Sequence, residues 1–153
     1  MKRVFLFIKK KYAKTILEKF GMGNCNPITT PLIVNEKLKK EDGSKDVDAS
    51  IYRSLVGSLL YLTATRPDIM YATSLLSRFM HNPRQTHIGV ARRVLRYIQG
   101  TLDYGILFER KVEPKLIGYC DSDCGRCLND MESTSGYVFS LGSGVFSGGS
   151  KKQ

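Results

Sequence analysis

Apolar residues recur every three or four positions between Asp48 and Gly100, and this spacing constrains the fold more than any other feature of the sequence. Side chains at that spacing lie on one face of an α-helix. We therefore expect three helices that bury one stripe each. The expected stripes are Ile51, Leu55, Leu59 and Leu62, then Ile69, Ala72, Leu76 and Phe79, and then Ile88, Ala91, Leu95 and Ile98.

Residues that favour helix ends flank each stripe. Aspartate and threonine cap helix N-termini, proline suits a first turn, and glycine adopts the left-handed conformation that ends many helices. Asp68 would also lie at the positive end of its helix dipole. The predicted starts are Asp48, Pro67 and Thr86, and the predicted ends of the second and third helices are Asn82-Pro83 and Gly100.

The segments on either side predict an α+β fold, in which a small helical bundle is followed by an antiparallel sheet. Before the bundle we expect a strand at residues 4–8, a helix at 9–20 that Gly21 or Gly23 stops, and an irregular segment at 25–31. Residues 35–48 resemble an exposed linker, where disorder concentrates. After the bundle, strands are expected at 104–108, 115–120, 136–141 and 145–147, the last two as a hairpin, with one sheet face or edge uncovered.

Positive charge is concentrated in the first two thirds of the chain. The net charge is +10, and residues 49–100 carry seven arginines and one acidic residue. Arginine pairs with phosphate through a planar fork, which favours a nucleic-acid partner, although a soluble surface would show the same composition. No apolar run reaches the roughly 20 residues of a membrane helix. The basic start is too short in apolar residues for a secretory leader, so we expect an intracellular protein, cytoplasmic or nuclear, without a membrane partner.

Three arginines, Arg92, Arg93 and Arg96, share one face of the third predicted helix. The buried stripe occupies the opposite face, so we expect all three to project into solvent. They form a candidate phosphate-binding face, and a plain solvated face stays open as the alternative. Residues 93–96 also spell R-x-L-R, a host-entry motif of oomycete effectors. We do not expect it to act as a targeting signal here, because it lies inside a predicted helix and no secretory leader precedes it.

Three cysteines, Cys120, Cys124 and Cys127, have the spacing C-x3-C-x2-C. That spacing is found in radical enzymes that hold a four-iron cluster, but these need a large barrel after the motif, and 26 residues follow here. A zinc site would lack a fourth ligand, because we expect His81 and His87 to be ordinary surface or interface residues. We therefore interpret the cysteines as reduced thiols and expect no cofactor in this chain.

Four stretches resemble the Pol polyprotein of copia-type LTR retrotransposons, in order and along nearly the whole chain. They are Tyr52–Leu62, Thr65–Ile69, Ala91–Thr101 and Ser133–Phe139, and the part from Lys11 to Pro31 is also similar. Some plant and oomycete sequences similar to this segment carry RxLR-effector-like names. The resemblance implies the end of a reverse transcriptase at 1–48, a helical thumb- or connection-like region at 49–110, and the truncated start of an RNase H-like sheet at 111–153.

The same resemblance implies a catalytic position at Asp121, the first ligand of a two-magnesium site in the parent family; Asp123 is the less favoured alternative. The remaining RNase H carboxylates would lie beyond Gln153 and the polymerase aspartates before Met1. The chain also departs from the family pattern at Cys124 and Gly148, where the family has tryptophan. We therefore expect an inactive segment that contacts RNA, DNA or their hybrid weakly and in a salt-dependent way; the alternative is an effector-like protein that binds another protein.

Overall fold

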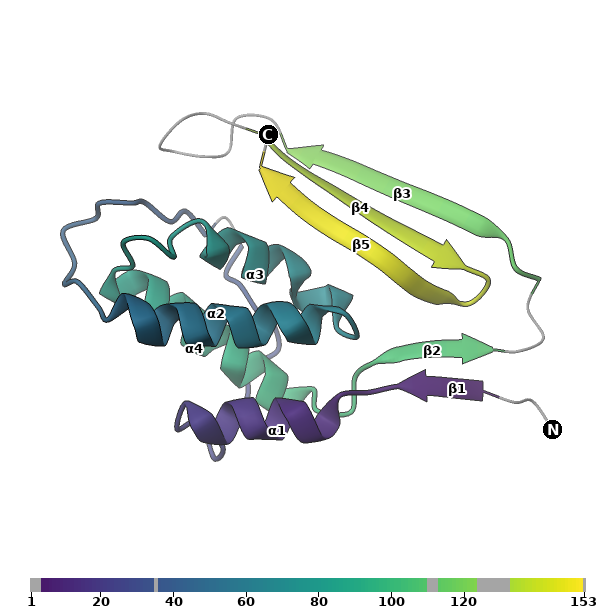
Figure 1. Ribbon diagram of the computed structural model, residues 1–153, viewed down its shortest axis with the longest axis horizontal. Helices are drawn as coiled ribbons and strands as arrows, with labels where there is room; N and C mark the ends of the chain where they lie inside the picture. Colours follow the sequence, from purple (N-terminus) through teal and green to yellow (C-terminus); the bar gives the residue numbers. More distant parts are fainter. Residues whose placement is uncertain (1–3, 35, 110–112, 124–132, 153) are drawn as a thin grey trace.

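The computed structural model describes residues 4–34, 36–109, 113–123 and 133–152 and has an α+β fold (Figure 1). Its helices are α1 (Lys10–Lys19), α2 (Ala49–Thr63), the 3-10 turn η1 (Pro67–Ile69), α3 (Met70–Ser77) and α4 (Gln85–Gly100). Its strands are β1 (Val4–Phe7), β2 (Ile106–Glu109), β3 (Leu116–Asp123), β4 (Thr134–Leu141) and β5 (Gly144–Lys152). The predicted fold class is confirmed.

The core lies among the helices and follows the predicted periodicity, except at one position. All residues of the second and third expected stripes are buried, as are Leu55, Leu59 and Leu62 of α2. Ile51 was expected in the core, but 55% of it is exposed, and its neighbour Tyr52 is fully buried instead. A helix turns by about 100° per residue, so Ile51 and Tyr52 point in different directions, and here Tyr52 is the one that faces the core. Tyr52 also donates a hydrogen bond from its hydroxyl to the carbonyl of Leu76, at 2.7 Å.

Asp48 caps α2 as predicted, and its carboxylate accepts a hydrogen bond from the Ser50 amide at 2.7 Å. The predicted cap of α4 was wrong. Arg84 occupies the N-cap position, while Thr86 lies inside the helix and donates its hydroxyl to Asp42. The backbone amide of Arg84 donates to Nδ1 of His87, so a histidine side chain supplies a hydrogen bond at this helix start and no threonine cap is present.

Two predicted helix ends differ as well. Gly100 is the last residue of α4 and is not left-handed. A Cβ at this position would lie 3.0 Å from Cβ of Pro27, so glycine serves the close approach of that loop. Helix α3 ends at Ser77, before Asn82-Pro83. Gly21, with φ of 68°, follows α1 as expected.

Two small antiparallel sheets complete the fold. In one sheet β1 pairs with β2, and this pairing brings the start of the described chain beside the segment that follows α4. In the other the strand order is β3-β4-β5, and a two-residue loop with Gly142 at φ of 61° connects the last two strands. Both strands of this hairpin are longer than the predicted ranges: β4 begins at Thr134, and β5 continues through Gly148 and Gly149 to Lys152.

One face of the three-stranded sheet packs on α3 at the β5 side (Figure 1). Ser74 of α3 donates to the carbonyl of Ser150 at 2.9 Å, and Gly148 approaches the Met70 side chain. The opposite face carries apolar side chains with large exposed fractions. These include Leu116, Tyr137, Phe139, Leu141 and Phe146.

The described part of the 35–48 segment is mostly exposed, as expected for a linker, and it is also held against the start of α4. Backbone hydrogen bonds join Gln85 to Lys45 at 2.9 Å and Val47 to Pro83 at 3.3 Å. Asp46 forms an ion pair with Arg84 at 2.6 Å. Backbone groups of this segment find their partners on α4 and the turn before it, although most of its side chains remain exposed.

We predict that backbone amides of residues 49–100 exchange with solvent more slowly than those of residues 116–152. The helices hold the buried core cluster, whereas the strands bury few side chains, and local opening is less costly where little apolar surface is buried. Hydrogen exchange followed by mass spectrometry measures this directly. Equal or stronger protection in β3–β5 would contradict the prediction.

Candidate functional site

The three candidate arginines of α4 have different surroundings. Arg92 is exposed, while Arg93 and Arg96 are half-buried beneath the segment before residue 31. Arg93 donates from Nη2 to Oγ1 of Thr30 at 2.9 Å, and Arg96 donates from Nε to the carbonyl of Asn26 at 2.8 Å. The expectation that all three project into solvent was therefore wrong for two of them.

This difference has a physical cause. The segment of residues 25–31 contains two prolines and forms no helix or strand, so its carbonyl groups need donors from elsewhere. Arg96 satisfies one of them and its own carbonyl accepts the amide of Ile28 at 3.4 Å. Nε of Arg93 is buried and has no hydrogen-bond partner. The helix face therefore anchors a loop and also presents one exposed cation, Arg92; phosphate binding by these arginines stays a prediction.

The R-x-L-R sequence at residues 93–96 lies in the middle of α4. Val94 and Leu95 are fully buried in the helical core, and both arginines hold the adjacent loop. A partner that reads this motif as an extended peptide would have to unfold the helix and expose core residues. The folded state therefore does not present the motif.

Asp121 lies in β3, opposite Gly136 of β4, and is exposed. It borders a cavity of about 430 Å³ between the sheet and α3, which Met70 and Tyr71 also line. Among the described side chains no three or more histidine, cysteine, aspartate or glutamate residues cluster in a way that could hold a metal ion. These side chains do not fit a two-magnesium centre. The side chain of Asp123 lies outside the described part.

Of the three cysteines in the C-x3-C-x2-C pattern, the structure describes one. Cys120 is an exposed free thiol, and Cys124 and Cys127 lie outside the described residues. Cys25 is a second free thiol, half-buried and far from Cys120 in the sequence. The interpretation of Cys120, Cys124 and Cys127 as reduced thiols stays a prediction for Cys124 and Cys127.

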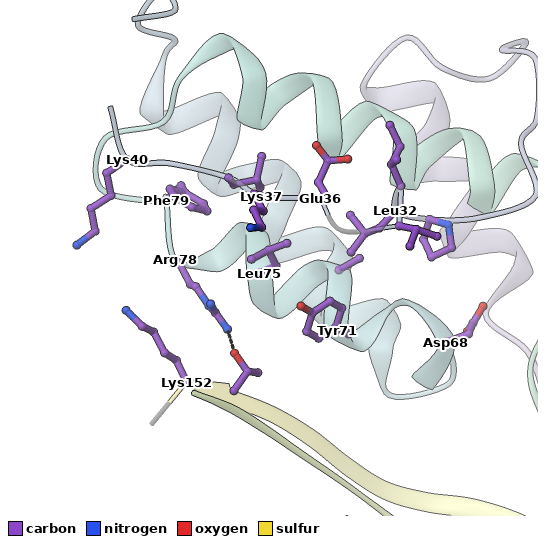
Figure 2. Close-up of a pocket in the computed structure, with 16 residues that line it drawn as sticks. Leu32, Glu36, Lys37, Lys40, Asp68, Tyr71, Leu75, Arg78, Phe79 and Lys152 are labelled. Carbon is purple, nitrogen blue, oxygen red and sulfur yellow. Dashed lines mark hydrogen bonds between the residues drawn. The ribbon is translucent and has the colours of Figure 1, made fainter. Parts of the chain in front are cut away.

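A larger cavity, of about 720 Å³, was not predicted from the sequence (Figure 2). We call it the basic cavity. It lies between the segment Pro31–Lys40, helix α3, and the ends of β4 and β5, and three parts of the chain far apart in sequence meet around it. Its cationic side chains are Lys37, Lys40, Arg78 and Lys152. Composition indicated a basic chain, but no sequence pattern brings these four residues together.

His87 was expected at the surface or an interface but is fully buried. Its ring stacks on Phe79 with centroids 4.0 Å apart. Nδ1 accepts the Arg84 amide at 2.9 Å, so the neutral ring carries its proton on Nε2 and donates it to the carbonyl of Lys39 at 2.8 Å. Burial lowers the pKa of His87 below its usual value, and the Lys39 hydrogen bond only partly opposes this.

Comparison with known proteins places the chain in a family. It is 40% identical over 145 residues to the Retrovirus-related Pol polyprotein from transposon RE1 of Arabidopsis thaliana, a match that covers 95% of this chain and 10% of the relative. The chain belongs to the copia-type Pol polyprotein family. It spans about a tenth of the length of that polyprotein.

Two other relatives of this copia-type segment are short proteins. An uncharacterized mitochondrial protein of Arabidopsis thaliana is 39% identical over 150 residues, which covers 97% of this chain and 62% of the relative. Secreted RxLR effector protein 161 of Plasmopara viticola is 46% identical over 103 residues, or 67% of this chain and 72% of the relative. No family model and no solved structure matches the chain.

In the described part of this copia-type segment, no helix combines the length and the apolar character that crossing a membrane requires. The expected intracellular location stays a prediction.

We predict that this copia-type segment loses stability as pH falls from about 7.5 to about 5.5, and that His87 is the main cause. A neutral His87 contributes stability above the unfolded-state pKa of about 6.5, and this is lost as pH falls toward the lower folded-state pKa, because the unfolded chain then binds more protons. His87→Phe should flatten the pH dependence. It should also cost about 1–3 kcal/mol at neutral pH, because two backbone groups lose their partner.

Urea unfolding at several pH values measures both effects. The exposed His81 gives the matched control, since His81→Gln removes one histidine without disturbing the core. The same pH dependence in wild type and His87→Phe would contradict the assignment to His87.

Proposed function

We propose that this chain is a non-catalytic segment of a copia-type reverse transcriptase and RNase H, and that it contacts RNA, DNA or their hybrid weakly through α4. The observation that carries the proposal is the exposed Arg92, next to Arg93 and Arg96, on a helix with no acidic side chain. Residues 69–102 contain no acidic residue at all. Uncompensated arginines on one surface favour phosphate binding, which releases counterions and depends steeply on salt.

The absence of catalysis is proposed from the ligand chemistry. A two-metal site that cleaves a phosphodiester needs several carboxylates on neighbouring strands. Their oxygen atoms would hold magnesium ions taken up from solution. Asp121 is the position that the family pattern assigns to the first ligand. Among the described side chains it belongs to no cluster of potential ligands.

A protein-binding role is the second candidate, and the relative named Secreted RxLR effector protein 161 favours it. A partner that packs on an apolar surface would bind with little dependence on salt, whereas phosphate contacts give a steep negative slope of log affinity against log salt concentration. A salt titration therefore separates the two candidates.

We predict that Arg92→Gln weakens binding to duplexes of every sequence alike and makes the salt slope shallower by about 0.9, the value for one lost phosphate contact. Fluorescence anisotropy at several salt concentrations measures both quantities. Arg92→Lys should keep most of the slope, and Lys14→Gln on the exposed side of α1 controls for loss of one positive charge. Unchanged affinity and slope in Arg92→Gln would assign Arg92 to the solvated surface.

Arg93→Gln and Arg96→Gln are less suitable for this test, because each removes a hydrogen bond that holds the 25–31 segment. These two variants should lower the unfolding midpoint as well as any affinity. Thermal unfolding recorded beside the binding data distinguishes the two effects.

We also predict that the purified chain does not cleave the RNA strand of an RNA–DNA hybrid in magnesium. A labelled hybrid incubated with the chain and resolved by gel electrophoresis gives the answer, with Asp121→Asn as the matched variant. Cleavage that disappears in Asp121→Asn would show that partner carboxylates exist and would refute the proposed lack of activity.

A further inference from the structure

The basic cavity has an uneven charge distribution. Figure 2 shows Lys40, Arg78 and Lys152 around one end, and Asp68 at the opposite end. Asp68 is paired with Arg66 at 2.7 Å and accepts the hydroxyl of Tyr97 at 2.8 Å, so its charge is compensated. The cationic end therefore favours an anionic ligand.

Arg78 is held in place at this end. Its Nη2 donates to Oγ1 of Thr134 at 2.7 Å, across the junction between α3 and the sheet. Its Nε is buried and out of reach of a ligand. The charge of the guanidinium is still held beside the cavity that Arg78 lines, and a phosphate is a strong partner for a guanidinium. The geometry thus offers a fixed cation at this end of the cavity.

The rest of the wall is apolar and aromatic. Tyr71 of α3 is 45% exposed and lies between Arg78 and Asp68 in Figure 2. Leu32, Leu75 and Phe79 also line the cavity. Glu36 adds a carboxylate whose Oε2 is buried without a hydrogen-bond partner, and the figure shows it on the other side from Arg78 and Lys152. Cations beside an exposed aromatic ring are the combination that single-stranded nucleic acids use for phosphate contact and base stacking.

We propose that the basic cavity binds one nucleotide of single-stranded nucleic acid, with its phosphate at Arg78, Lys40 and Lys152 and its base against Tyr71. The volume of about 720 Å³ lies within the range of small-molecule sites. A paired base is stacked in its duplex and does not enter such a cavity, so the ligand must be unpaired. The inference rests on the proposed nucleic-acid contact but assigns a second site, away from Arg92.

The test is fluorescence anisotropy of the full chain with a labelled oligothymidylate of about 12 nucleotides, a length within the site sizes of single-strand binders. Lys40→Gln should make the salt slope shallower by about 0.7, the value for one lost contact to a single strand. Tyr71→Ala should weaken binding about fivefold or more, as loss of one stacked base does. A hairpin duplex of similar length should bind less tightly than the oligothymidylate.

Arg78→Gln should also make the salt slope shallower, and Thr134→Val is its matched control. The valine removes the hydrogen bond to Arg78 and leaves the charge in place, so it should keep the wild-type slope. If Thr134→Val instead matches Arg78→Gln in affinity and slope, Arg78 acts by holding the sheet, and the assigned phosphate contact is refuted.

Other results would also overturn the proposal. An unchanged slope in Lys40→Gln, or unchanged affinity in Tyr71→Ala, would exclude the assigned contacts. Displacement of the oligothymidylate by a polyglutamate peptide at equal charge concentration would assign the cavity to acidic proteins. Arg92→Gln separates this inference from the proposed function: a loss confined to Arg92→Gln refutes the cavity site, and a loss confined to Lys40→Gln and Tyr71→Ala refutes the contact through α4.

Discussion

The buried guanidinium of Arg66 fixes the arrangement on which the rest of the molecule depends. Only 2% of Arg66 is exposed, and it donates to both oxygens of Asp68, to the carbonyl of Thr101 and to its hydroxyl. Burial opposes ionisation of Asp68, but the hydrogen bonds and charge of Arg66 outweigh it and hold the Asp68 pKa below its usual value. Tyr97 completes the network. These contacts to Thr101 and Tyr97 tie the start of η1 to the end of α4.

This tie sets the position of both sheets. Helix α3 follows η1 directly and supports β5 through Ser74, and Arg78 just after the helix supports β4 through Thr134. The chain leaves α4 beside Thr101 and enters β2. The 36–48 segment is held against α4 from the other side through His87 and Arg84. The basic cavity lies where residues 31–40, α3 and the ends of β4 and β5 meet, so its shape depends on the contacts that hold these three parts together.

The arginines of α4 show how one helix face can serve two purposes. Arg93 and Arg96 hold an irregular loop whose carbonyls need donors, while Arg92 stays in solvent. Loop anchoring and phosphate binding use the same chemistry of a guanidinium with oxygen acceptors. Part of the cationic surface of this segment therefore holds a loop in place and is not free to bind a partner.

The sequence by itself determined the helices, most of their buried faces and the family, because periodicity of apolar residues and local motifs depend on neighbours in the chain. It also placed the hairpin, since a glycine-containing turn between two strands is a local signal. The pairing of β1 with β2, the burial of His87 and the exposure of Ile51 were decided by tertiary structure. So was the basic cavity, whose cations come from residues 37, 40, 78 and 152. Contacts between such distant positions follow from how helices and sheet pack, and no local pattern encodes that packing.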